Sequence, residues 1–183
     1  MAALKLGTRG SKLALTQAGL VRDALVRYDR ALLCAIGACG LEIGANDWTV
    51  FLESFPTPSA CAEASLADVL RLWQGLGYPR RARNLHATAA AVVHRHDGRL
   101  PDDLHSLSAL PGIGPYTARA LLAFAFERDV AVVDTNIARV LARTTGERLT
   151  PKRAQAAADE LVPIGDGWLW NQVFMDGGAG MCP

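Results

Sequence analysis

A short turn with two glycines constrains this chain more than any other feature of its sequence. Residues 110–115 read Leu-Pro-Gly-Ile-Gly-Pro, and they separate two segments in which apolar residues recur with the period of an amphipathic helix. Glycine lets the backbone turn tightly and approach a ligand without a Cβ in the way. The amides of Gly112 to Gly114 would then lie at the N-terminus of the next helix, where anions bind. The segment predicts a helix–hairpin–helix unit whose turn is either an ordinary structural corner or a phosphate site.

The same helical period extends over most of the chain after residue 60. Alanine is abundant and β-branched alternation is scarce, so the pattern favours an all-α fold. Ser65 is a predicted N-cap, and Pro56 and Pro58 predict a turn, because proline cannot continue a helix interior. Helices are predicted over residues 66–73, 81–96, a short segment after 100, 115–126, 135–144, 151–161 and 168–175.

Composition limits the classes of protein that remain. The 183 residues are 50% hydrophobic and 20% charged, which suits one globular domain, or one domain with an appendage. A net charge of +1 excludes a global basic field but leaves a local basic face possible. Four cysteines in a chain of this length suit a reducing compartment rather than a disulfide framework. No apolar run reaches membrane-spanning length. We therefore expect a soluble cytoplasmic protein that does not span a membrane.

Asp134 is the candidate functional carboxylate. It ends the apolar run 130–133 and directly precedes a predicted helix, where its side chain could accept hydrogen bonds from the amides of Asn136 or Ile137 as an N-cap. Such a cap would also hold the carboxylate ionised at a fixed position. Arg139, one turn into this helix, could be solvated, ion-paired or bound to a phosphate.

Taken together, these segments resemble the helix–hairpin–helix DNA glycosylases, the superfamily of endonuclease III and adenine DNA glycosylase. The similarity covers roughly residues 48–183, and several separate motifs look like the adenine glycosylase branch in order and spacing. These motifs are Phe55–Pro58, Leu72–Tyr78, Arg81–His86, Leu110–Ala118, Val132–Val140 and Trp170–Ala179.

The resemblance implies hydrolysis of the N-glycosidic bond of a flipped adenine, opposite 8-oxoguanine or guanine, in double-stranded DNA with a mismatched or damaged base pair. Asp134 would stabilise the positive charge of the oxocarbenium-like sugar. Tyr116 stands where bifunctional members carry the lysine that forms a Schiff base, which implies a monofunctional enzyme. Tyrosine there is also similar to a thymine-mismatch branch, and Tyr116 could equally be an aromatic that packs against the hairpin. The DNA-binding residues implied are Leu110, Pro111, Gly112, Ile113, Gly114, Thr117, Asn136 and Arg139.

Two features of the family are missing from this sequence. The family's acid is a glutamate on a helix that reads like Glu-x-Met-x-Gln-Gln-Thr, and no Gln-Gln-Thr occurs here. Glu42 and Glu53 are the nearest carboxylates and lack the flanking residues, so we expect impaired activity. The alternatives are a non-catalytic DNA-binding remnant and a thymine-mismatch glycosylase. Family members also close with four cysteines on a 4Fe–4S cluster. Only Cys182 matches a ligand, the first, so we expect no cofactor in this chain and a free thiol at this position.

The N-terminal segment has a different resemblance. Residues 4–11 look like a short strand that enters a glycine turn, and residues 4–28 resemble the opening of hydroxymethylbilane synthase. In that family the residues that match Arg9 and Ser11 contact the dipyrromethane cofactor, but its other motifs are absent here. We therefore expect an atypical segment over residues 1–47, a glycosylase domain over 48–183 that stops before the iron–sulfur loop, and a chimeric or truncated chain.

Overall fold

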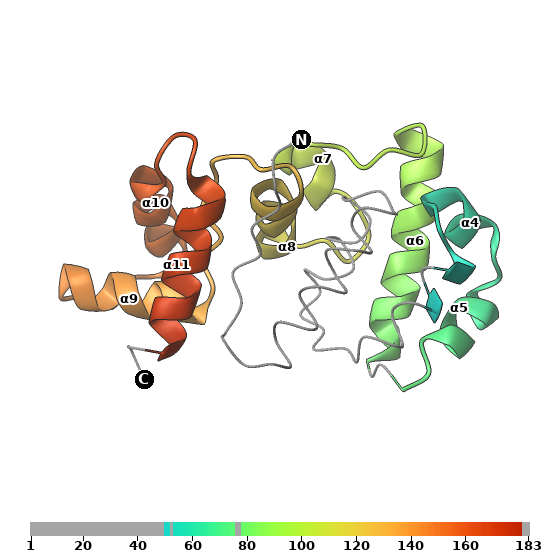
Figure 1. Cartoon of the computed structure of the whole chain (residues 1–183), viewed down its shortest axis with the longest axis horizontal. Coiled ribbons are helices and arrows are strands. Elements are labelled where there is room, and N and C mark those ends of the chain that lie inside the picture. Colours follow the sequence, from blue (N-terminus) through green and yellow to red (C-terminus); the bar gives the residue numbers. More distant parts are fainter. Residues whose placement is uncertain (1–49, 52, 76–77, 181–183) are drawn as a thin grey trace. The chain divides into compact units, whose positions relative to one another are not determined.

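The computed structural model describes residues 50–51, 53–75 and 78–180. Regular structure within these ranges is helical, and none of them forms a strand, which confirms the all-α prediction. The strand predicted near residue 4 lies outside the described residues. In chain order the helices are α4 (Pro58–Glu63), α5 (Leu66–Leu72), α6 (Pro79–Arg95), α7 (Leu104–Ser108), α8 (Pro115–Ala120), η1 (Leu121–Ala125), α9 (Thr135–Thr145), α10 (Pro151–Leu161) and α11 (Gly167–Gly180) (Figure 1).

Local capping explains where several of these helices begin. Ser65 caps α5 as predicted, and its hydroxyl accepts a hydrogen bond from the Asp68 amide at 3.2 Å. The turn predicted at Pro56 and Pro58 is wrong in part, because α4 begins at Pro58 and is capped by Thr57. Proline in the first turn of a helix loses no hydrogen bond, since the amide there has no intrahelical partner.

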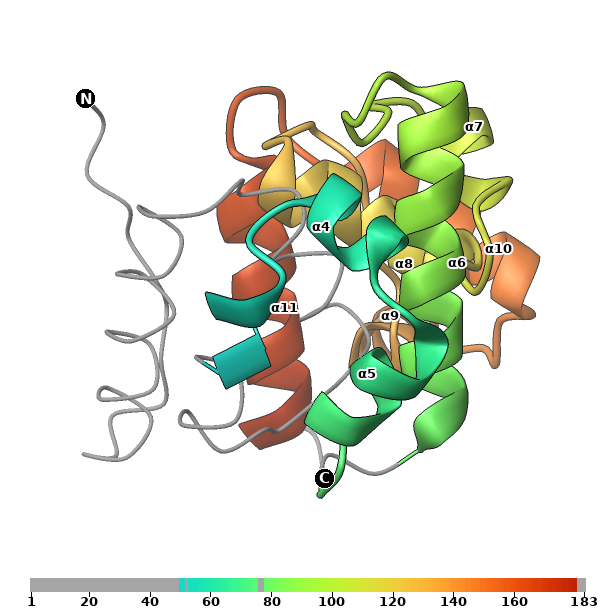
Figure 2. The ribbon, with the colours of Figure 1, turned by 90° about the vertical axis from the view of Figure 1, so that its right-hand side faces the viewer.

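The chain divides into two compact units. The first comprises Met1–Pro101 with Ala109–Gly112, and the second comprises Asp102–Ser108 with Ile113–Pro183. In the first unit α4 and α5 pack against α6, as Figure 2 shows. Its core is rich in aromatic side chains, because Phe51 meets Phe55 and Trp73 edge to face, with ring centroids 5.1 and 5.6 Å apart. Cys61 and Val69 are buried in the same cluster.

In the second unit α11 packs against α9, and α10 packs against α9 as well. Its core cluster is built from Ala131, Ile137, Leu141, Ala154 and Ala158. The single helix predicted over residues 115–126 is instead α8 followed by the wider π-helical turn η1. Such turns insert an extra residue into a helix, and no pattern of apolar spacing distinguishes them.

None of the described helices combines the length and the apolar character that crossing a membrane would require.

Candidate functional site

The glycine turn has one glycine that the structure requires and one that it leaves free. Gly112 has φ +75°, and a Cβ placed on it would lie 2.3 Å from Nδ2 of Asn84 and 2.6 Å from the Cβ of Asn84. Gly114 has φ −84° and is the N-cap residue of α8, with nothing within 4 Å of an added Cβ. Because only the first position needs a left-handed backbone and a close approach, the two glycines can be tested separately.

The first half of the turn is fixed by α6. The hydroxyl of Thr88, which is 6% exposed, donates a hydrogen bond to the Pro111 carbonyl at 2.6 Å. Leu110 is buried in the same unit. On the other side of the unit boundary Ile113 is buried too, and Thr117 is half-buried. Contact of these residues with DNA stays a prediction.

Asp134 is the N-cap of α9, as predicted. Its Oδ1 accepts the Ile137 amide at 2.7 Å, so of the two amides considered it is Ile137 that donates. Asn136 instead donates from its side chain, with Nδ2 3.1 Å from Asp134 Oδ2. Both carboxylate oxygens are therefore held at a helix N-terminus, where the helix dipole favours a negative charge.

Tyr116 lies close enough to Asp134 for the two groups to interact electrostatically. Burial raises the pKa of the Tyr116 hydroxyl above its usual value, and the negative charge of Asp134 raises it further. The side chain is nevertheless 44% exposed. A tyrosine is protonated at neutral pH at its usual pKa of about 10, and the upward shift makes ionisation harder still, so the Tyr116 hydroxyl stays a hydrogen-bond donor.

The segment that leads to Asp134 is held by side chains rather than by a neighbouring strand. Asn171, which is 0% exposed, accepts the Val132 amide with Oδ1 and donates from Nδ2 to the Val130 carbonyl, both at 2.8 Å. The Ala131 carbonyl accepts hydrogen bonds from Arg119 at 3.3 Å and Gln155 at 3.1 Å.

Further side chains complete this network. Arg119 also forms a two-contact ion pair with Asp159, at 2.7 and 3.0 Å. Asp129 accepts the amides of Gly165 and Gly167 at 2.8 and 3.1 Å. The sequence predicts no role for these residues, although Asn171 lies in the Trp170–Ala179 motif. Gln172 and Asp176 are polar residues of the same helix, so the pattern alone does not distinguish Asn171.

Arg139 is anchored to α11, because its guanidinium donates to the Gly178 carbonyl at 3.1 Å. The backbone of α11 comes very close there, since a Cβ on Gly178 would lie 2.8 Å from the Asn136 Cβ. The sequence left open whether Arg139 is solvated, ion-paired or bound to a phosphate. The structure shows a further interaction, a hydrogen bond to a helix carbonyl. A phosphate contact of Arg139 stays a prediction.

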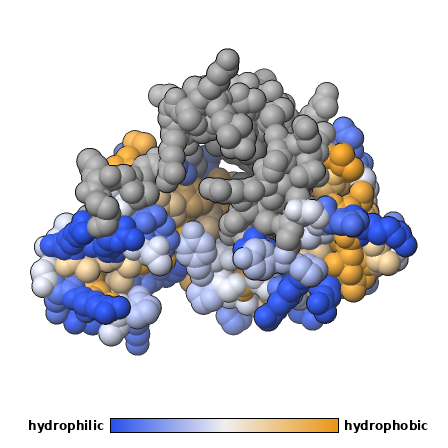
Figure 3. Space-filling view, turned by 90° about the horizontal axis from the view of Figure 1, so that it is seen from below, coloured by the Kyte–Doolittle hydropathy of each residue, from blue (hydrophilic) through white to orange (hydrophobic). Residues whose placement is uncertain are grey.

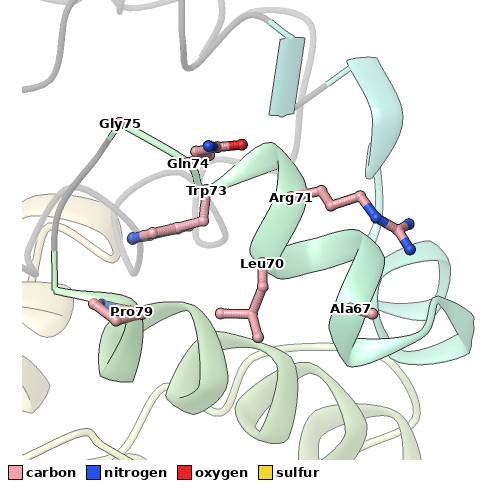
Figure 4. A pocket seen from close by; sticks show the side chains of 7 residues that line it. All are labelled: Ala67, Leu70, Arg71, Trp73, Gln74, Gly75 and Pro79. Carbon is pink, nitrogen blue, oxygen red and sulfur yellow. The ribbon is translucent and has the colours of Figure 1, made fainter.

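An open pocket of about 550 Å³ lies in the first unit and is lined by Ala67, Leu70, Arg71, Trp73, Gln74, Gly75 and Pro79 (Figure 4). Its lining is mostly apolar and includes none of the predicted site residues. On the same unit hydrophobic side chains gather at the surface on the right of Figure 3, and Val50 and Leu66 are among its exposed hydrophobic residues. The pocket carries no group suited to bond-breaking chemistry.

The remaining candidates are the two glutamates considered as catalytic acids and the cysteines considered as metal ligands. Glu53 is exposed on the first unit, while Glu42 and Cys182 lie outside the described residues. Burial raises the pKa of the Cys61 thiol to about 11, which makes it a poor metal ligand. No group of three or more histidine, cysteine or acidic side chains comes together within the described ranges. These ranges therefore offer no ligand set for an iron–sulfur cluster.

Comparison with known proteins relates this arrangement to a family. Among curated proteins, the adenine DNA glycosylase of Mycobacterium tuberculosis (strain CDC 1551 / Oshkosh) is 52% identical over 101 residues, 55% of this chain and 33% of that protein. The adenine DNA glycosylase of Homo sapiens is 37% identical over 144 residues, 75% of this chain and 26% of that protein. The chain thus spans a third or less of the length of these two relatives.

Solved structures share the fold. A thermostable thymine-DNA glycosylase superposes with a TM-score of 0.74 at 20% identity, covering 92% of this chain and 87% of that one. Endonuclease III from a non-covalent DNA complex superposes with a TM-score of 0.71 at 19% identity, covering 94% and 86%. The family model for the HhH-GPD superfamily base excision DNA repair protein matches residues 38–164. Since that match covers more than half of the sequence, the chain belongs to the HhH-GPD superfamily of base excision DNA repair proteins.

Proposed function

We propose that this chain is a monofunctional DNA N-glycosylase of the adenine branch, which removes adenine opposite 8-oxoguanine or guanine in double-stranded DNA. The observation that carries the proposal is the Asp134 carboxylate, fixed by two hydrogen bonds at the start of α9 beside a protonated Tyr116. The names of the two curated relatives favour adenine over thymine as the target base.

The chemistry follows from these two groups. The C1′–N bond of the flipped nucleotide breaks, and the sugar develops positive charge that the Asp134 carboxylate stabilises. A water molecule then forms the new C1′–O bond and releases a proton to solvent, while the departing adenine takes up a proton from solvent, so that one water is consumed overall. Tyr116 has no amine, so the sugar cannot be captured as a Schiff base, and the strand is left uncut.

A group that protonates the departing adenine is not among the residues placed at this site. Glu53 is exposed on the first unit, and Glu42 lies outside the described residues. Acid catalysis by a positioned group contributes about 10²- to 10⁴-fold. We therefore expect excision at least roughly 10²-fold slower than in a family member with an intact catalytic glutamate.

The hairpin and the start of α9 would supply the contacts to DNA. Amides of the hairpin turn would bind phosphates, which position the protein without reading sequence. With a net charge of +1, binding should be weak and only shallowly dependent on salt. We expect a monomer in the cytoplasm or on the nucleoid. The likeness of residues 4–28 to hydroxymethylbilane synthase and the domain boundary at residue 48 remain predictions, and the first of these lies outside the described residues.

The test is a single-turnover excision assay on one duplex sequence with three central pairs: adenine opposite 8-oxoguanine, thymine opposite guanine, and adenine opposite thymine. Products are measured with and without alkali, because a monofunctional enzyme leaves an abasic site that alkali must cleave. Slow release of adenine from the first duplex alone is the expected result. Release of thymine would instead support the thymine-mismatch alternative. Binding without any release at long times would leave the non-catalytic DNA-binding remnant.

A further inference from the structure

We propose that Asn171 is a positioning residue for the Asp134 carboxylate, so that α11, and not only α9, determines where the charge lies. The inference rests on the proposed function for its kinetic consequence, but its structural half stands on the contacts of Asn171 alone. Asn171 does not touch the carboxylate, and it acts through the backbone of residues 130–133.

The contacts of Asn171 use the whole of its amide group. Oδ1 accepts from the Val132 amide, and Nδ2 donates to the carbonyls of Val130 and Gly167, all at 2.8 Å. Asn171 thus presents to the 130–133 segment the same donor and acceptor pair that a neighbouring β-strand would present. Asn171, Val132 and Gly167 are buried and Val130 is half-buried, so removing the amide group leaves polar backbone atoms without compensation.

The segment held in this way is only two residues from the carboxylate. Val132 is completely buried, Val133 packs against the core cluster of the second unit, and Asp134 follows with its cap to Ile137. A shift of the backbone at Val132 must therefore move the carboxylate or break its cap. Displacement of a reacting group by about 1 Å can cost roughly 10²-fold in rate.

A second contact of α11 lies on the other side of the carboxylate. At Gly178 the helix backbone approaches Asn136 so closely that an added Cβ would lie 2.8–2.9 Å from its atoms. Asn136 is the residue whose side chain donates to Asp134 Oδ2. The helix therefore contacts the chain before and after Asp134, which is why we assign the positioning role to α11 and its buried amide.

The test compares Asn171→Leu, which keeps the shape and removes both hydrogen-bonding groups, with Leu141→Ala as a control. Leu141 lies on α9 and is buried in the core of the second unit. Its apolar side chain forms no hydrogen bond to the 130–133 segment. Thermal unfolding identifies the temperature at which both variants are equally folded. If Asn171→Leu does not fold by circular dichroism, Asn171→Asp takes its place, because it retains the acceptor toward Val132 and loses the donor toward Val130.

Two readouts decide the outcome. In single-turnover excision we expect the rate constant of the Asn171 variant to fall at least tenfold, with full amplitude and a DNA Kd within threefold of the unsubstituted chain. A purely structural role would instead lower the amplitude, and the Leu141→Ala control would lose amplitude to a similar extent. Equal rate constants for the variant and the unsubstituted chain would overturn the proposal.

The second readout is independent of activity. Amide hydrogen exchange at Val132 and Ile137 reports the Asn171 bond and the Asp134 cap directly. We expect at least tenfold faster exchange at both amides in the Asn171 variant, and little change at Ile137 in the control. If the unsubstituted chain excises no base, the proposed function fails while this readout still decides the positioning role. Unchanged protection of Ile137 in the Asn171 variant would refute it.

Discussion

Each of the two compact units is stabilised internally by a different kind of interaction. Large aromatic side chains fill the core of the first unit, where Trp73 and Phe55 surround Phe51. In the second unit the buried core consists of three alanines with Ile137 and Leu141, and the stacked aromatic pair Trp170 and Phe174 is only partly buried against it. Buried or half-buried polar side chains hold the segment that leads to Asp134. Apolar burial is non-directional and gives stability, whereas directional hydrogen bonds fix the place of a particular atom. We therefore expect core substitutions in the first unit to affect mainly stability, and substitutions in the polar network of the second unit to affect mainly the position of the Asp134 carboxylate.

The largest expected effect is on the aromatic core. Replacing Trp73 by alanine should lower the free energy of unfolding by about 3–5 kcal/mol, because it removes a buried aromatic side chain and leaves a cavity. The side chain is only 3% exposed. Urea unfolding measures the change, and Trp73→Phe, which keeps an aromatic ring, should lose markedly less. A loss below about 1 kcal/mol for alanine would show that the core packs loosely.

Substitutions of the two hairpin glycines should have smaller effects on stability than the loss of Trp73, and the two effects should differ clearly from each other. Gly112→Ala should cost about 1–3 kcal/mol, because alanine is strained at φ +75° and would collide with Asn84. Gly114→Ala should change stability by less than about 0.5 kcal/mol, since nothing lies near its Cβ position. If Gly114→Val then weakens DNA binding without loss of stability, the turn binds DNA. Unchanged affinity would make it a structural corner only.

Two ion pairs of the second unit should differ in their contribution to stability, with smaller effects than those of the hairpin glycines. Arg119 is 18% exposed and also bonds to the Ala131 carbonyl, so Arg119→Met should cost about 1–2 kcal/mol. The pair of Arg153 with Glu147 is more than half exposed on both sides, so Arg153→Met should cost no more than about 0.5 kcal/mol. Chemical denaturation of both variants measures the difference. Equal losses would mean that the network around Ala131 adds nothing.

The smallest effect concerns pH and the first unit. Burial raises the pKa of Cys61 from 9.0 to about 11, so the unfolded chain loses this proton before the folded one does. The contribution of the thiol to stability is thus fully present below about pH 9 and is lost as the pH rises toward 11. Mass spectrometry after iodoacetamide treatment at pH 8.5 should find the Cys61 peptide unlabelled in the folded chain and labelled in urea. Rapid labelling of the folded chain would place this thiol at the surface.

Local signals explain which features the sequence predicted. The start of α5 and the cap of α9 depend on Ser65 and Asp134, residues that act within three positions of themselves, so the sequence is enough. The start of α4 was missed because Pro58 can either break a helix or begin one. Asn171 acts on residues 39 and 41 positions away. Only the tertiary fold brings these atoms together, and no sequence pattern in a single chain reveals them.

The most direct test of the account is the Asp134→Asn variant, assayed for single-turnover adenine excision and for DNA binding in parallel. Asparagine is as good an N-cap as aspartate, so α9 should keep its start while the negative charge is lost. We expect the excision rate constant to fall by about 10²-fold or more, with the DNA Kd and the unfolding temperature nearly unchanged. Excision at close to the original rate by the uncharged variant would contradict the central claim that the Asp134 carboxylate carries the chemistry.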